Sequence, residues 1–85
     1  MQLTFSKSAF KALRAMQPKV ARAFTNRLRR IADNPLARHA NVEPMTGTDD
    51  TFRLRLGDRR AVYVIDREQN QMRVERIASR GDAYQ

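Results

Sequence analysis

The sequence predicts an α+β fold in the order β-α-α-β-β-β, with one antiparallel sheet and an αα-hairpin packed on one face. A strictly alternating stretch at 51–56 is followed by a two-residue turn and a β-branched run, which is typical of a β-hairpin. Two earlier stretches repeat apolar residues at helical spacing, and a proline separates them. Placing both helices on the apolar side of the sheet hides every apolar stripe and leaves the other side open.

Length and composition restrict the class of protein. A chain of 85 residues predicts a single domain, 1–85, with a compact core. The absence of cysteine excludes disulfides, thiolate metal sites and cysteine nucleophiles, and it fits a reducing compartment. We also find no secretory signal and no apolar run long enough to cross a bilayer. We therefore expect a cytoplasmic protein without a membrane partner.

The charge predicts a polyanionic partner. Seventeen Lys and Arg against nine Asp and Glu give a formal charge of +8, which favours nucleic acid through counterion release and long-range attraction. Arginine supplies most of this charge, and its planar fork suits bidentate phosphate contacts. The alternative is a solvated basic surface that contacts an acidic protein.

Short-range signals predict the first half of the chain. Residues 2–5 alternate polar and apolar as a short strand does, and Ser6 is a typical helix N-cap. A helix is expected from Lys7, and Pro18 both ends it and suits the first turn of the next helix. The apolar positions of the first helix are Ala9 or Phe10, Leu13 and Met16.

The second helix is expected from Pro18 to about Ala32. Its apolar stripe recurs at steps of four, four and three, as an amphipathic helix requires. The stripe consists of Val20, Phe24, Leu28 and Ile31, and the other face carries Lys19, Arg22, Arg27, Arg29 and Arg30. Solvation is the usual reason for such a charged face.

Residues 36–50 form a polar connection that we expect to pack partly on the body through Leu36, Val42 and Met45. The single histidine, His39, lies here without a Cys or carboxylate at ligand spacing, so a loop position explains it better than a metal site. No metal and no cofactor are expected.

The hairpin places two kinds of side chain on opposite faces. Phe52, Leu54 and Leu56 face a core, whereas Arg53 and Arg55 face the other way. After the Gly57-Asp58 turn, the strand 59–65 brings either Arg59 or Arg60 beside them, and Tyr63 is expected to pack rather than to react.

The last strand follows a polar turn at 66–70. Met72, Val74 and Ile77 are its apolar positions, and strict alternation would turn Arg76 toward the core. A β-bulge between Val74 and Ile77 reconciles the two. Residues 78–85 form a short polar tail.

The segments FRLRLGDRRAVYVID and VERIASRGDAY, together with the element order, resemble the RelE/ParE toxin superfamily. The resemblance covers nearly the whole chain. It implies a toxin of a type II toxin-antitoxin system. In the RelE branch such toxins cut messenger RNA on the ribosome without metal and so inhibit translation, whereas in the ParE branch they poison DNA gyrase.

Carried across by position, the resemblance assigns catalytic roles in an endoribonuclease. Arg60 matches the phosphate-binding arginine and Arg80 the tail arginine, and we expect both to hold and stabilise the phosphate. Arg53 and Arg55 match basic positions that are usually lysines. Tyr84 matches the terminal aromatic residue, which argues for the RelE branch, and we expect it to stack on an unpaired base.

The chemistry of these residues supports the same assignment and exposes a gap. Cleavage by a neighbouring 2′-hydroxyl needs alignment, stabilisation of a dianionic phosphorane and two proton transfers. Convergent arginines supply the stabilisation, but arginine is a poor general base. Asp82, Glu75 and His39 are the candidate acceptors, and no spacing places any of them beside Arg60.

Expected partners are a cognate antitoxin, the ribosome with its message, and promoter DNA bound only by the toxin-antitoxin complex. Two alternatives stay open: a ParE-like gyrase inhibitor, and a non-catalytic basic module that binds nucleic acid or antitoxin.

Overall fold

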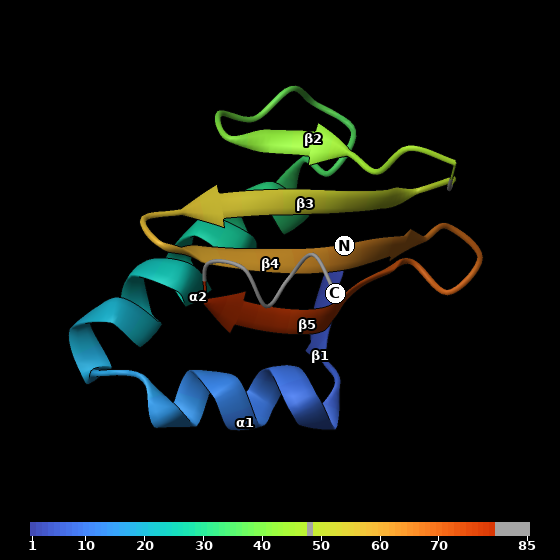
Figure 1. Cartoon of the computed structure of the whole chain (residues 1–85). Helices are drawn as coiled ribbons and strands as arrows, with labels where there is room; N and C mark the ends of the chain where they lie inside the picture. Colours follow the sequence, from blue (N-terminus) through green and yellow to red (C-terminus); the bar gives the residue numbers. More distant parts are fainter. Residues whose placement is uncertain (48, 80–85) are drawn as a thin grey trace.

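The computed structural model describes residues 1–47 and 49–79, and it has the predicted α+β architecture (Figure 1). Two helices are followed by most of a five-stranded sheet whose spatial order is β1-β5-β4-β3-β2. In chain order the elements are β1 (Gln2–Phe5), α1 (Lys7–Ala15), α2 (Pro18–Asp33), β2 (Val42–Pro44), β3 (Thr51–Leu56), β4 (Arg59–Asp66) and β5 (Gln71–Ser79).

The sheet differs from the prediction in two details. It is mixed rather than wholly antiparallel, because β1 lies parallel to β5, whereas β2 to β5 pair antiparallel in chain order. The connection 36–50 also contains an additional edge strand, β2, which is too short at three residues for its alternation to be recognised.

Both helices begin as the sequence predicts. The Ser6 hydroxyl caps α1 by accepting a hydrogen bond from the Ala9 amide at 3.0 Å. Pro18 occupies the first turn of α2, where the missing amide hydrogen costs nothing. The Ser6 hydroxyl also donates to the Glu75 carbonyl at 2.6 Å, so a single side chain joins the helix start to β5.

We expect Ser6→Ala to lower the free energy of unfolding by about 1–2 kcal/mol, because it removes a cap and a bond to β5 together. Thermal or urea unfolding measures this loss. Ser8→Ala, at an exposed position in the same helical turn, is the control and should change stability little. Equal stability of the two variants would contradict the dual role of Ser6.

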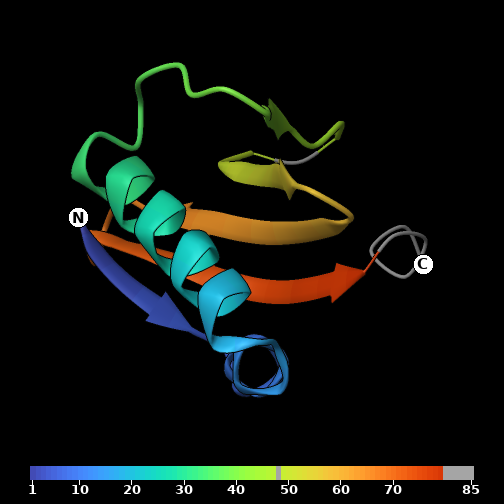
Figure 2. The ribbon, with the colours of Figure 1, turned by 90° about the vertical axis from the view of Figure 1, so that its left-hand side faces the viewer.

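The core lies between the helices and one face of the sheet. Phe24, Leu28 and Ile31 of α2 are fully buried and belong to one cluster with Leu54 and Tyr63 of the sheet. Figure 1 shows α2 passing behind the strands, and Figure 2 shows the same layer from the side. On α1 the buried positions are Ala9 and Leu13, whereas Phe10 is exposed.

The connection packs only in part as predicted. Val42 and Met45 are half-buried, but Leu36 is 65% exposed, so the expectation that it anchors the connection was wrong. Hydrogen bonds hold the chain here instead: the Met45 amide donates to the Thr51 carbonyl, and the Ile65 amide to the Asp50 carbonyl.

The predicted β-bulge is present in β5. Tyr63 pairs with Val74 and Val62 with Arg76, which leaves Glu75 as the additional residue. The extra residue resets the alternation, so Val74 and Ile77 are both buried while Arg76 lies opposite Val62 and is exposed. The bulge therefore keeps Arg76 off the core side.

Among the described residues, no helix is both long and apolar enough to span a membrane.

Candidate functional site

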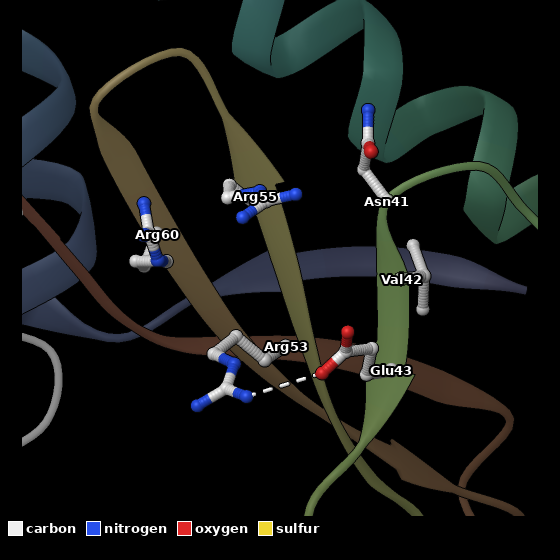
Figure 3. Close-up of a pocket in the computed structure, with 6 residues that line it drawn as sticks. All are labelled: Asn41, Val42, Glu43, Arg53, Arg55 and Arg60. Carbon is white, nitrogen blue, oxygen red and sulfur yellow. Dashed lines mark hydrogen bonds and ion pairs between the residues drawn. The ribbon is translucent and has the colours of Figure 1, made fainter.

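Three predicted arginines share the face of the sheet that the helices leave open. Arg55 on β3 pairs directly with Arg60 on β4, and Arg53 pairs with Val62. Directly opposite residues point to the same side of a sheet, so the three guanidinium groups lie over one surface (Figure 3). Residues 53 and 60 are half-buried and buried respectively, whereas Arg55 is exposed.

Arg60, rather than Arg59, lies on the open face of the sheet with Arg53 and Arg55. Arg59 pairs with Leu56, whose side chain packs against the core on the helix side. It lines a separate hollow with Lys19 and Val20 of α2. The two neighbouring arginines of β4 therefore serve opposite faces of the sheet.

A hollow of about 390 Å³ lies over these arginines, and β2 forms its other wall. The volume is in the range of small-ligand sites. Its lining consists of Asn41, Val42, Glu43, Arg53, Arg55 and Arg60.

Glu43 is the site residue that sequence reasoning missed. It lies directly opposite Arg53 in the β2–β3 pair, and its Oε2 accepts a hydrogen bond from Arg53 Nη2 at 3.2 Å. The carboxylate is 71% exposed and so remains accessible from the hollow. The only local signal was the triplet Val-Glu-Pro, which by itself does not predict on which face of the sheet the glutamate lies.

Contacts with α2 and β3 place the β2 wall. Arg27 of α2 donates a hydrogen bond to the Ala40 carbonyl, and the Arg55 amide donates to the Asn41 carbonyl at 2.9 Å. Asn41 adopts a left-handed backbone with φ of 61°, a conformation that asparagine tolerates better than most residues. The chain turns into β2 at this point, which sets Glu43 opposite Arg53.

The pairing of Arg55 with Arg60 lowers the stability of the folded state, because like charges directly opposite each other in a sheet repel. Arg60 is also only 9% exposed, and a guanidinium with little access to water interacts strongly with an anion beside it. An arrangement that is unfavourable for folding and favourable for anion binding indicates a functional site.

Tyr63 is a core residue, as predicted. Its ring stacks on Phe52 with centroids 5.5 Å apart, and its side chain is 1% exposed. Burial raises the pKa of Tyr63 to about 12, although the charge of Arg27 acts in the opposite direction. The hydroxyl therefore stays protonated near neutral pH and is not a general base.

Of the remaining sequence candidates, the structure describes only Glu75 and His39. Arg80, Asp82 and Tyr84 fall outside the described residues. Glu75 forms an ion pair with Arg73 at 3.0 Å, and a ring nitrogen of His39 lies 2.8 Å from the Asn34 carbonyl oxygen. Neither Glu75 nor His39 lines the hollow. Within 1–47 and 49–79, no group of three or more potential metal ligands occurs.

A family model described as "ParE toxin of type II toxin-antitoxin system, parDE" matches residues 3–84. No curated protein matches the sequence.

Several solved structures share this fold. The isolated E. coli RelE toxin superposes with a TM-score of 0.80 at 23% identity, over 98% of this chain and 89% of that one. The archaeal RelE–RelB complex from Pyrococcus horikoshii OT3 gives 0.80 at 25% identity, over 95% and 96%. A YoeB/ParE toxin from Agrobacterium tumefaciens gives 0.77 at 17% identity, over 93% and 98%.

Proposed function

Because the chain belongs to the ParE toxin family of type II toxin-antitoxin systems and has a RelE-like fold, we propose that it is a metal-independent endoribonuclease that cleaves messenger RNA on the ribosome and inhibits translation. The observation that carries this proposal is the convergence of Arg53, Arg55 and Arg60 over a hollow whose opposite wall supplies Glu43.

The arginines stabilise the reacting phosphate. Attack of the 2′ oxygen on the adjacent phosphorus forms a phosphorane with two negative charges, and it displaces the 5′ oxygen to leave a 2′,3′-cyclic phosphate. Preorganised cations aimed at the phosphoryl oxygens lower this barrier without reorganising during the reaction. Arg60 is the central group because it is both buried and part of the lining.

Glu43 supplies the proton acceptor that the sequence candidates did not provide. An exposed carboxylate held by Arg53 in the wall of the hollow takes the proton from the 2′-hydroxyl, and water protonates the departing 5′ oxygen. Arg53 orients the carboxylate, while Arg55 neutralises the phosphate charge. Arg80 as a further phosphate ligand and Tyr84 as a base-stacking residue complete the proposed site.

A second candidate function is inhibition of DNA gyrase, which the match to the ParE toxin model favours. Such a poison acts by binding a protein and needs no proton acceptor beside its arginines. The Glu43–Arg53 pair inside the hollow is the reason to prefer the ribonuclease.

Primer extension on messages carried by translating ribosomes tests the proposal against this alternative. We expect cuts at fixed positions within codons and normal supercoiling by gyrase in a parallel assay. Intact message with inhibited supercoiling would establish the gyrase function instead. Intact message with normal supercoiling would leave a non-catalytic module that binds nucleic acid or antitoxin.

Related structures include toxins solved with their antitoxins, among them the intact E. coli RelBE toxin-antitoxin complex. We propose that a cognate antitoxin binds this chain in the cytoplasm, and that only their complex binds promoter DNA.

Arg27→Met is expected to slow single-turnover cleavage roughly tenfold, because the lost bond to the Ala40 carbonyl releases the β2 wall that holds Glu43. Stability should fall by only about 1 kcal/mol. Arg38→Met, which removes an exposed arginine from the following connection, is the control with the same loss of charge. A destabilised Arg27→Met protein with an unchanged cleavage rate would show that Arg27 does not position the wall.

A further inference from the structure

The positive charge of this protein is concentrated in its helical layer, not in the candidate site. Of the 17 Lys and Arg, eight lie in α1 and α2, whereas only one of the nine Asp and Glu, Asp33, does. The strands and connections are therefore close to neutral as a group. Arginines outside the helices, such as Arg53, Arg67 and Arg73, form ion pairs, but within the described part of the chain no helix cation does.

The exposed cations of α2 lie on one side of the helix. Phe24, Leu28 and Ile31 are buried against the sheet, and the exposed cations occupy the opposite side. These cations are Lys19, Arg22, Arg29 and Arg30, and we call them the α2 basic face. They extend over about 16 Å of helix axis at the usual rise per residue. Figure 2 shows α2 as an outer layer on the sheet, and the hollow lies on the other side.

Helix stability does not explain this pattern. The first turn of α2 holds no acidic residue to complement the helix dipole, and Lys19 is placed where a cation is unfavourable. An acidic residue four positions away stabilises an exposed helix, but only Arg29 has one, Asp33, whereas Lys19, Arg22 and Arg30 have none. A surface that needed only solubility would mix both signs of charge.

We propose that the α2 basic face is a second nucleic-acid-binding surface, which holds the phosphate backbone of folded RNA while the hollow on the other side holds the strand to be cut. Backbone contacts of this kind position a protein without reading sequence. An acidic protein partner fits the face less well, because protein interfaces depend on apolar or aromatic anchors. The exposed large apolar residues of the described chain are Phe10 and Leu36, and neither lies on α2.

The choice of RNA over other polyanions rests on the proposed function, whereas the existence of the surface does not. The two can fail separately, since binding of a duplex requires no cleavage. A protein that binds RNA duplex through α2 but cuts no message would retain this inference and lose the proposed function.

The test compares the full-length chain with Arg22→Gln/Arg29→Gln/Arg30→Gln, using a short blunt RNA duplex in fluorescence anisotropy. A matched control, Arg38→Gln/Arg67→Gln/Arg73→Gln, removes three exposed arginines from outside the helices and changes the net charge equally. Measurements between about 50 and 200 mM KCl give the dependence of affinity on salt. Circular dichroism verifies that each variant is folded.

We expect the α2 variant to bind roughly 10- to 100-fold more weakly at about 0.15 M salt and its log–log salt slope to fall by about two to three, while the control changes much less. If both variants lost affinity equally, net charge alone would explain the effect and the proposal would be overturned. No loss of affinity in either variant would also overturn it. Tighter binding of a DNA duplex or of polyglutamate than of the RNA duplex would overturn the choice of RNA. If the triple variant does not fold, Arg22→Gln alone should lower the slope by about one.

Discussion

Arg60→Ala is expected to lower the rate of message cleavage by about 10²- to 10³-fold, the usual effect of removing a preorganised donor from a charge-stabilising site. Arg60 is the buried arginine of the hollow, and it lies between Arg55 on β3 and Ala78 on β5. Its removal therefore takes away the cation with the least access to water. Single-turnover cleavage on translating ribosomes measures the loss.

Arg59→Ala is the matched control for this experiment. The two arginines are neighbours in β4, but Arg59 lies on the helix side, away from the hollow. Arg60→Lys keeps the charge without the planar fork and should restore only part of the rate. If Arg59→Ala lost as much activity as Arg60→Ala, the loss would come from the fold of β4 and the phosphate role of Arg60 would be wrong.

Glu43→Gln is expected to slow cleavage by about 10²- to 10⁴-fold, the usual range for a lost general base. Binding of an RNA with a deoxynucleotide at the scissile position should not weaken, because the amide keeps the shape of the side chain. Stability should also change little, since an exposed ion pair such as Glu43–Arg53 contributes only about 0–1 kcal/mol.

Glu75→Gln provides the control, because Glu75 also pairs with an arginine, Arg73, but lies away from the hollow. A reduced rate only in the Glu43 variant supports proton transfer. Full activity of Glu43→Gln would limit Glu43 to orienting Arg53, and the acceptor would have to come from the ribosome or from the substrate.

Much of the fold was predictable because its signals are local. The Ser6 cap, the Pro18 helix start and the stripe ending at Ile31 each depend on residues within one or two helical turns. The bulge at Glu75 was predictable from a break in a two-residue period. The short strand β2 was not predictable, because three residues contain too little periodicity. Leu36 was wrongly expected to pack on the body, because a single apolar residue in a connection does not indicate which way its side chain points.

Within the candidate site, the sequence by itself determined that Arg53 and Arg55 share a face, because side chains two apart in a strand always do. Only the tertiary structure decided that Arg60 rather than Arg59 joins them and that Glu43 faces Arg53. The physical reason is register: which residues meet across a sheet depends on how separate strands align, and shifting that alignment by one residue exchanges the two faces. The sequence thus determined which residues alternate, and the packing of β2 and β4 against β3 determined which of them form the site.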